Sequence, residues 1–308
     1  MMISVVIPVY RSAETITLLA EKLENELKKL SADYEIVFVD DASPDNSLEI
    51  LKGIAENNKN IKVISLSRNF GQHPAIYCGI KHACGDVIIV MDCDLQEDPK
   101  YIPDLIAKYN EGYDVVFTYR NMRKYVWWKN ILVRIFVIIY NYLIHDDRLI
   151  TSRNVGSFSL ISKKVAQAFL NFGDYQFHYL MVLRWLGFKQ TYIKIEHQER
   201  KHGKSSYNFK RLFEHALVAI VFYSDKLLRI NVYVGFAIAL LSFIAGIFVI
   251  VGYFLHGFAA GWPSIVILIL FSFGIILFSL GITGIYIGKM FEQTKKRPIF
   301  IVDKKINL

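Results

Sequence analysis

The stretch MDCDLQEDP, residues 91–99, places several acidic side chains directly after the apolar run DVIIV. Residues two apart in an extended segment point to the same side, so Asp92 and Asp94 are expected to lie together. Their like charges repel each other, and a hard divalent cation, which prefers oxygen ligands, would offset this repulsion. Gln96 is two residues further on and can add a neutral oxygen. The pattern therefore indicates a metal site formed by Asp92, Asp94 and Gln96.

A solvated acidic turn is the alternative interpretation of the same stretch. Asp98 followed by Pro99 is typical of a helix start, with the carboxylate as cap and proline in the first position. The two interpretations are compatible, because Asp98 can cap a helix while Asp92 and Asp94 bind a metal.

A second acidic cluster, VDDASPD at residues 39–45, follows another apolar run. Asp40 is placed to accept hydrogen bonds from a base or ribose, as acidic residues at strand ends do in nucleotide-binding folds. Residues 43–45 are typical of a turn that leads into a helix. The sequence has neither the glycine fingerprint of dinucleotide-binding proteins nor a P-loop, which argues against a nicotinamide enzyme or an ATPase.

Short strand-like runs alternate with helical stretches over residues 1–120. The runs are 3–10, 35–41, 62–67, 86–92 and 114–120, and the helical stretches are 13–30, 46–57, 72–84 and 99–110. This alternation predicts a doubly wound, mostly parallel α/β sheet. Both acidic clusters would then face one crevice at the carboxyl ends of the strands. Two further strands are predicted at 156–162 and 191–198.

The C-terminal part of the 308-residue chain is strongly apolar, and no Asp, Glu, Lys or Arg occurs from Ile230 to Gly288. This length fits two membrane-spanning helices joined by the turn HGFAAGWP. A buried helical hairpin in a soluble core is the alternative, but such helices usually carry a charged face. The basic residues lie outside the spans and predict that both ends of the hairpin face the cytoplasm: Lys226, Arg229, Lys289, Lys295, Lys296 and Arg297.

Two amphipathic segments, residues 126–144 and 206–229, are predicted to lie at the membrane interface. The first contains Trp127, Trp128 and Arg134, although an ordinary core helix would also fit it. A net charge of +8 suits anionic lipids or an anionic substrate. Nucleic acid is the competing partner, but the sequence shows no nucleic-acid-binding motif. The three cysteines have no zinc-like spacing and are predicted to be reduced thiols.

Five ordered motifs together resemble family 2 glycosyltransferases of the polyprenyl-phosphate class. They are VVIPVY, VFVDDASPDNS, LSRNFGQHPAIYCGIKHACGD, MDCDLQEDP and ERKHGKSSYNFKRL, and the resemblance covers essentially the whole chain. It implies a GT-A fold, a nucleotide-sugar donor, a Mg²⁺ or Mn²⁺ ion and inverting transfer to a lipid phosphate such as undecaprenyl phosphate. A UDP-sugar is favoured over GDP-mannose. The spans could also support a homo-oligomer.

The resemblance also implies roles for individual residues. The donor site would comprise Pro8, Val9, Tyr10, Asp40, Asp41, Asp92, Arg200 and Lys204. The metal would be held by Asp92, Asp94 and Gln96. The acceptor phosphate would be held by Arg120, Arg134 and Ser157. Asp94, Arg120 and Arg134 would be the catalytic residues.

The sequence departs from the family pattern in the stretch NVGSFSLIS, residues 154–162. Many relatives carry an Asp and an Arg where this chain has Ser157 and Ser159, so we predict no side-chain base. A phosphate acceptor is mostly dianionic at neutral pH and needs none.

Two other functions fit parts of the sequence less well. A processive polysaccharide synthase is disfavoured, because Met181 replaces the Gln of its Q-x-x-R-W motif and two spans seldom form a polymer channel. A non-catalytic sensor of nucleotide-sugars is disfavoured by the intact Asp92, Asp94 and Gln96 set. The predicted domains are a GT-A domain (1–205), a juxtamembrane helix (206–229), a membrane hairpin (230–290) and a cytoplasmic tail (291–308).

Overall fold

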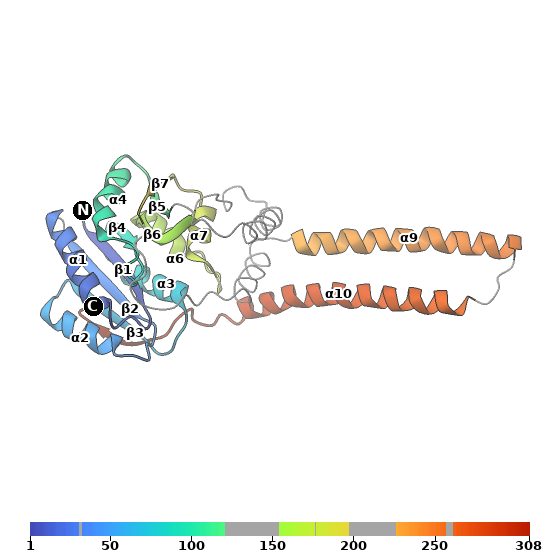
Figure 1. Ribbon diagram of the computed structural model, residues 1–308, viewed down its shortest axis with the longest axis horizontal. Coiled ribbons are helices and arrows are strands. Elements are labelled where there is room, and N and C mark those ends of the chain that lie inside the picture. The colour runs from blue at the N-terminus through green and yellow to red at the C-terminus, as the bar shows by residue number, and fades with distance from the viewer. Residues whose placement is uncertain (31–32, 121–153, 176, 197–225, 257–260) are drawn as a thin grey trace. The chain divides into compact units, whose positions relative to one another are not determined.

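The computed structural model describes residues 1–30, 33–120, 154–175, 177–196, 226–256 and 261–308 (Figure 1). They form an α/β unit and a separate helical unit. In the described part of the α/β unit, eight strands form one mixed sheet in the order β7-β5-β6-β4-β1-β2-β3-β8. The strands are β1 (Ile3–Val9), β2 (Tyr34–Asp40), β3 (Ile61–Leu66), β4 (Val87–Val90), β5 (Val115–Arg120), β6 (Asn154–Ser162), β7 (Gln190–Lys194) and β8 (Val302–Ile306).

Most of the strands run in the same direction. The pairs β1–β2, β1–β4, β2–β3 and β5–β7 are parallel, whereas β6 and β8 run against their neighbours. The five runs from the N-terminal part are confirmed as strands, with the predicted helices between them. The sheet is mixed because β6 inserts antiparallel between β4 and β5, a direction that the local sequence pattern does not encode.

Helices cover both faces of the sheet. They are α1 (Ile16–Lys29), α2 (Ser47–Asn57), α3 (Gln72–His82), the 3₁₀ turn η1 (Pro99–Tyr101), α4 (Ile102–Asn110), α6 (Lys163–Leu170) and α7 (Tyr179–Trp185). Side chains of α1, α2 and α4 join one buried core, and those of α3, α6 and α7 join another. The architecture is therefore a three-layer α/β/α sandwich.

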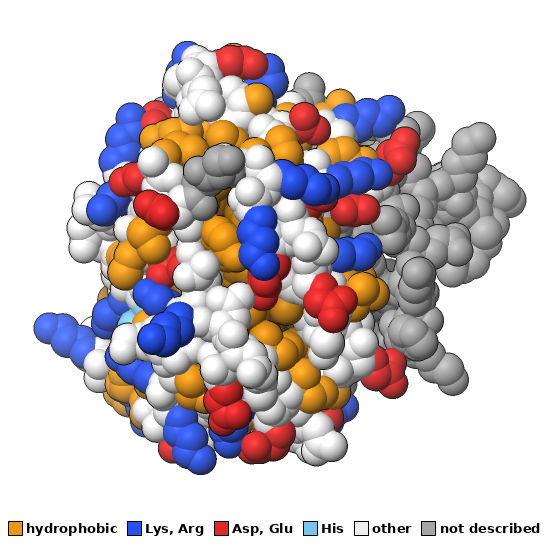
Figure 2. Space-filling model, turned by 90° about the vertical axis from the view of Figure 1, so that its left-hand side faces the viewer, with side chains coloured by type: hydrophobic (Ala, Val, Ile, Leu, Met, Phe, Trp, Pro, Cys, Tyr) orange, Lys and Arg blue, Asp and Glu red, His pale blue; other side chains and the backbone are white. Residues whose placement is uncertain are grey.

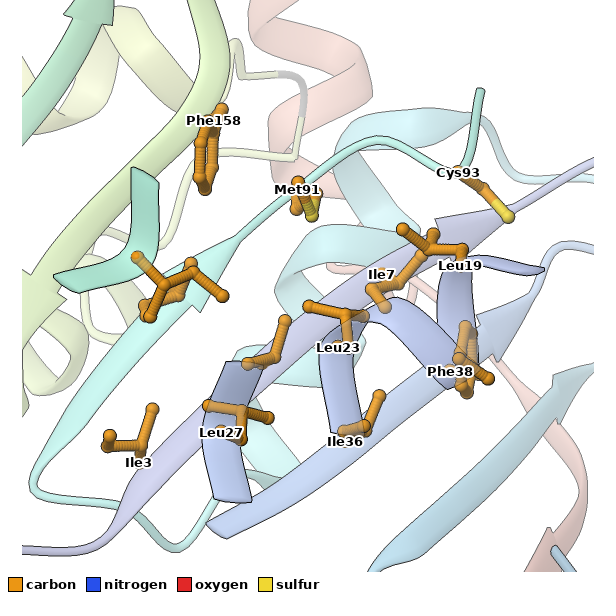
Figure 3. Close-up of a cluster of buried hydrophobic side chains, with 14 of the residues drawn as sticks. Ile3, Ile7, Leu19, Leu23, Leu27, Ile36, Phe38, Met91, Cys93 and Phe158 are labelled. Carbon is orange, nitrogen blue, oxygen red and sulfur yellow. The ribbon is translucent and has the colours of Figure 1, made fainter. Parts of the chain in front are cut away.

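The first core shows why α1 forms where it does. Leu19, Leu23 and Leu27 recur every four residues and lie on one face of the helix, all fully buried (Figure 3). They pack against Ile3 and Ile7 of β1 and against side chains of β2. Burying a leucine side chain contributes roughly 1.5–3 kcal/mol, so this stripe fixes α1 firmly to the sheet.

Helix α3 lies unusually close to the other face of the sheet. A Cβ atom on Gly79 would come within 2.3 Å of Cγ1 of Val6 and 3.2 Å of Cγ2 of Val39. Only glycine permits this approach, since a larger residue would push the helix away from β1 and β2. The close packing fixes the position of the N-terminus of α3, which borders the site described below.

The end of the chain is part of the sheet. Strand β8 pairs antiparallel with β3, so residues assigned by sequence to a tail form the edge of the α/β unit. The sequence does not predict this strand, because the segment VDKKI is mostly polar. Exposed Asp303, Lys304 and Lys305 are typical of an edge strand that must not pair with other chains.

The surface of the α/β unit in Figure 2 carries both signs of charge. Lys and Arg side chains are interspersed with Asp and Glu over the described part of this face. All three cysteines are free, as predicted, and burial raises the pKa of Cys78 and Cys93 to about 12.

The helical unit contains two long helices, α9 (Lys226–His256) and α10 (Trp262–Thr294), which lie side by side (Figure 1). The Asn231 side chain donates a hydrogen bond of 2.8 Å to the Ser279 hydroxyl and so links them. Phe271 and Phe278 of α10 are 64% and 70% exposed, which is unusual for a helix in water.

Among the described residues, one stretch, Phe271–Thr294, is long and apolar enough to cross a membrane. At 1.5 Å per residue its 24 residues reach about 36 Å, more than the ~30 Å of a bilayer core. This helix is consistent with membrane association, and the second span stays a prediction. The first predicted interface segment, 126–144, and residues 206–225 of the second lie outside the described residues.

A buried ion pair at the opposite end of the sheet from the carboxyl ends of the parallel strands generates a stability prediction. Glu35 is 2% exposed and accepts from the Cys84 amide at 2.6 Å, while its other oxygen lies 2.5 Å from Nζ of Lys62. Burial alone would raise the pKa of Glu35, but the Cys84 amide, Lys62 and Ser4 lower it overall. A lowered carboxyl pKa contributes stability that is present above the unfolded pKa of about 4.3 and is lost as pH falls.

Lys62→Met should therefore destabilise the protein by up to about 3 kcal/mol at pH 7, since it leaves a buried carboxylate uncompensated. The gap to the wild type should narrow towards pH 4, where Glu35 of the variant becomes neutral. Thermal unfolding in detergent at both pH values measures this. Lys52→Met, which breaks the exposed pair with Glu49, is the control and should cost at most about 0.5 kcal/mol. A difference in stability between Lys62→Met and the wild type that does not change with pH would show that Lys62 does not stabilise the charged form of Glu35.

Candidate active site

The carboxyl ends of the parallel strands bring the predicted donor residues to one edge of the sheet. Val9 of β1 is paired with Asp40 of β2, and Pro8 with Val39. Val9 and Asp40 are buried, whereas Tyr10 is 43% exposed just beyond the strand. Of these residues, Tyr10 therefore has the side chain most available to a ligand.

The loops after β1 and β2 are tied together by short polar side chains. Oδ2 of Asp45 accepts from the Ala13 amide at 3.2 Å, and its Oδ1 accepts from the Ser47 amide at 3.2 Å. Burial would raise the pKa of Asp45, but these bonds and the Ser47 hydroxyl lower it overall. The carboxylate of Asp45 thus positions the loop that carries Tyr10.

Asp41 holds a third loop, the one between β3 and α3. Its two carboxylate oxygens accept from the backbone amides of Phe70 and Gly71 at 2.7 and 2.8 Å. Gly71 has φ of 101°, a conformation that favours glycine. Burial raises the pKa of Asp41 and of Asp40 despite these bonds and the bond from the Ser43 amide to Asp40. Asp41 is therefore a buried organiser of this loop.

The same loop reaches the acidic cluster that opened the sequence analysis. Nε2 of Gln72, the first residue of α3, donates to Oδ1 of Asp92 at 2.7 Å. Phe70, Gly71 and Gln72 thus connect Asp41 with Asp92. The two acidic clusters lie at one edge of the sheet, as predicted from the ends of their strands.

The turn after β4 has a defined backbone. Oδ1 of Asp94 accepts from the Gln96 amide at 3.1 Å, and Leu95 between them has φ of 58°. Oδ1 of Asp98 accepts from the Lys100 amide at 3.1 Å and caps η1, with Pro99 in the first position. The predicted cap is confirmed. Glu97 is only 1% exposed and also lies within this turn.

The donor set for a metal consists of two carboxylates and one amide. The described residues contain no group of three or more His, Cys, Asp or Glu side chains arranged around a metal position. A pair of carboxylates suits Mg²⁺ or Mn²⁺, which usually keep water and substrate phosphates as their other ligands. The chemistry of Asp92 and Asp94 fits such an ion, while Gln96 is 7% exposed and has a described contact through its backbone.

Strand β6 brings the two serines of the altered motif to different environments. Ser159 is buried opposite Val90 and its hydroxyl lies 3.0 Å from the Tyr179 hydroxyl, so it serves packing. Ser157 is half-buried and lies beyond the end of β4, on the side of Asp92. Arg120 ends β5 at this edge and its backbone pairs with Asn154.

Four predicted residues have no described side chain. Arg134, Arg200 and Lys204 lie outside the described residues, as does the side chain of Arg120. The roles of these residues stay predictions.

Two groups that build the site were not predicted from the sequence: the amides of Phe70 and Gly71, and the side chain of Gln72. The stretch RNFGQ was noted only as part of a longer motif. A glycine immediately before a helix start was the available signal, because it marks a backbone turn that positions the first helical amides.

The sequence profile described as "Glycosyl transferase family 2" matches residues 4–170, which include β1 to β6 and both acidic clusters. The chain belongs to glycosyl transferase family 2. It is an enzyme of the glycosyltransferase class, as the motifs indicated.

Named relatives align over nearly their whole length. CsbB of Bacillus subtilis (strain 168), which carries only a provisional glycosyltransferase name, is 35% identical over 100% of this chain and 92% of its own. The prophage bactoprenol glucosyl transferase homolog of Escherichia coli (strain K12) is 33% identical over 99% of both chains. The bactoprenol glucosyl transferase of Shigella phage SfX is 30% identical over 99% of this chain and 100% of its own.

A solved structure supports the fold. Glucosyl-3-phosphoglycerate synthase from Mycobacterium tuberculosis, in complex with Mn²⁺, UDP and phosphoglyceric acid, matches 71% of this chain and 76% of its own. The TM-score is 0.51 and the sequence identity 17%. The α/β unit of this glycosyltransferase is therefore GT-A-like.

Asp41→Asn should lower kcat/KM for sugar transfer about tenfold without unfolding the protein. An asparagine side chain has a single oxygen in place of the two carboxylate oxygens, so either the Phe70 amide or the Gly71 amide loses its acceptor. A buried amide without an acceptor costs about 1–3 kcal/mol. Steady-state kinetics at neutral pH, together with circular dichroism, measures this. Asp104→Asn is the control, since Asp104 is exposed on α4. Wild-type kinetics in Asp41→Asn would show that the loop keeps its shape without the carboxylate.

Proposed function

We propose that the enzyme transfers a sugar from a nucleotide-sugar, a UDP-sugar rather than GDP-mannose, to a polyprenyl phosphate such as undecaprenyl phosphate. Transfer proceeds with inversion and gives a lipid-linked monosaccharide for cell-envelope glycans. The names of the E. coli and phage relatives support the lipid acceptor, because those proteins align with this chain end to end. The UDP in the solved relative supports the donor class.

The observation that carries the proposal is the link from Asp41 through Phe70, Gly71 and Gln72 to Asp92. It joins the strand end proposed to bind the base and ribose with the strand end proposed to bind the diphosphate. A nucleotide laid along this edge would meet Tyr10 at one end and Asp92 and Asp94 at the other. One rigid loop therefore sets the distance between the two halves of the donor site.

A divalent ion fits Asp92 and Asp94, with Gln96 as the proposed third ligand, and the Mn²⁺ of the solved relative is consistent with this. When bound, the ion supplies positive charge that stabilises the departing nucleoside diphosphate. The carboxylates hold and orient it at the edge of the sheet. Arg200 and Lys204 are proposed to lie on a loop that closes over the donor.

The acceptor chemistry needs no side-chain base. A phosphate oxygen of the lipid attacks the anomeric carbon, the new C–O bond forms, and the bond to the nucleoside diphosphate breaks with its electron pair. A phosphate monoester with a second pKa of ~6 is already mostly dianionic at neutral pH. Arg120 and Arg134 are proposed to hold it in line, and Ser157 to donate a hydrogen bond.

The proposed location is the cytoplasmic membrane, with two spans and both chain ends in the cytoplasm. The described α/β unit contains residues that precede α9 and the β8 strand that follows α10. A hairpin whose two ends return to one folded unit crosses the membrane an even number of times, which agrees with the basic flanks. Anionic lipids beside the basic flanks and a homo-oligomer formed through the spans are further parts of this proposal.

Membranes that contain the enzyme, incubated with undecaprenyl phosphate and a panel of labelled nucleotide-sugars, test the proposal directly. Label should enter the lipid extract from one UDP-sugar and only when polyprenyl phosphate is present. Label that enters only water-soluble or polymeric products would contradict it.

Asp94→Asn should abolish this transfer, and EDTA should abolish it reversibly, because both remove the proposed ion. The fold should be unchanged in circular dichroism. Asp98→Asn is the matched control from the same turn and should stay active, since asparagine caps a helix as well as aspartate does. Full activity of Asp94→Asn in metal-free buffer would refute the metal site.

Ser157→Ala should keep activity within about tenfold, a loss of ~1.4 kcal/mol or less, because the serine is not a base. The rate of both wild type and variant should fall below pH ~6 as the lipid phosphate is protonated. A pH profile of the transfer rate measures this. Efficient transfer to a hydroxyl acceptor, with no product on lipid phosphate, would overturn the base-free chemistry.

A further inference from the structure

The C-terminal tail, residues 297–308, belongs to the α/β unit. It contacts the elements on both sides of the loop that joins the acidic clusters. This loop, residues 67–71, is called the bridging loop here; it begins after β3 and ends at α3. The Ser67 amide donates to the Ile301 carbonyl at 2.9 Å, so the tail is bonded to the first residue of the loop. The pairing of β8 with β3 continues this contact along the strand.

On the other side of the loop, the tail contacts α3 through one aromatic residue. The ring of Phe300 lies 6.2 Å from that of Tyr77 and 6.4 Å from that of His82, centroid to centroid. Nζ of Lys81 lies 5.6 Å from the same ring centroid. Phe300 therefore packs against the helix whose first residue, Gln72, bonds Asp92.

The tail is also anchored at its far end. Nδ2 of Asn307 donates to the Ala55 carbonyl at 2.7 Å and to the Ile61 carbonyl at 2.9 Å. These carbonyls lie near the end of α2 and at the start of β3. The strand is thus held at both ends, and Ser65, the register partner of Asp40 on β2, is paired with Lys304 in its middle.

We propose that the C-terminal tail, through Phe300 and the carbonyl of Ile301, positions the bridging loop for donor binding. The tail touches the elements on either side of the bridging loop, whose own hydrogen bonds to Asp41 come from the amides of Phe70 and Gly71. Displacing the tail would free the Ser67 amide and remove the contacts of Phe300 with α3, and the amides of Phe70 and Gly71 would lose part of their alignment with Asp41. The donor site therefore depends on a segment that follows both long helices in the sequence.

The inference rests on the proposed function only for the identity of the ligand. Phe300 touches no reacting group, so it is a positioning residue. Its loss should affect the binding of a nucleotide and not the handling of the lipid acceptor. A purely structural role would lower thermal stability without this selectivity.

Phe300→Ala in the full-length protein tests the inference with two measurements. Hydrogen exchange should become faster at Phe70 and Gly71, and the Kd for UDP in the presence of Mn²⁺, measured by calorimetry, should rise about tenfold, with GDP as a second probe. The apparent KM for undecaprenyl phosphate should stay within about twofold. Phe300→Leu keeps the apolar volume and should restore both properties.

Lys304→Ala is the matched control, because Lys304 lies in the same tail, on β8, with an exposed side chain. It should leave exchange in the loop and the affinity for UDP unchanged. Asn307→Ala loosens the far end of the tail and should give a weaker version of the Phe300→Ala effect. If Phe300→Ala does not fold, the same two measurements on Asn307→Ala test the positioning role of the tail.

Unchanged exchange at Phe70 and Gly71 in a folded Phe300→Ala protein would overturn the inference, as would an equal loss of affinity for UDP and lipid. The exchange measurement needs no substrate. A wild-type protein that transfers no sugar to lipid would refute the proposed function alone, while the exchange result would still support or overturn the positioning role.

Discussion

The burial of Asp41 is the constraint on which the site depends. A carboxylate taken out of water is costly unless hydrogen bonds replace its hydration, and here two backbone amides do so. The two amides belong to Phe70 and Gly71. These residues lie 29 and 30 positions after Asp41 in the sequence. The charge at the end of β2 therefore dictates the shape of the loop after β3. That loop in turn brings Gln72 to Asp92, so one buried charge aligns two strand ends.

The sheet makes this arrangement rigid. The carboxyl ends of parallel strands lie at one edge of the sheet. The side chains that directly follow these strands are therefore close to one another. Gly79 allows α3 to lie directly against β1 and β2, so the N-terminus of α3 is fixed relative to both acidic clusters. Asp45 adds the loop after β1 to the same assembly. Rigid placement of charged and polar groups is what electrostatic stabilisation in an active site requires.

The apolar helices and the α/β unit are interleaved in the sequence. The described α/β unit includes β8, which follows α9 and α10 in the sequence. An anchor at the very end of a chain would leave the catalytic domain complete without it. In this glycosyltransferase the last strand pairs with β3, the strand that leads into the bridging loop. The fold of the α/β unit thus includes residues from both sides of the apolar helices.

The local sequence determined a large part of this protein. The alternation of short apolar runs with helical stretches predicted β1 to β5 and the helices between them, because strands covered on both faces are apolar almost throughout. The position of Asp92 and Asp94 after an apolar run predicted their place at the edge of the sheet, and Asp98 with Pro99 predicted the start of η1. Five motifs indicated the family, which the profile match over residues 4–170 confirmed.

Only the tertiary structure decided which groups hold the site together. The antiparallel insertion of β6, the bonds from Phe70 and Gly71 to Asp41, and the docking of Phe300 and Asn307 all join residues far apart in the chain. No local pattern encodes such pairs, because each partner has an ordinary sequence environment and the contact exists only once the sheet has formed. The mostly polar segment VDKKI becomes a strand because β3 offers it an unpaired edge. A sequence records which residues must be buried or exposed, whereas their partners follow from the closed, packed fold.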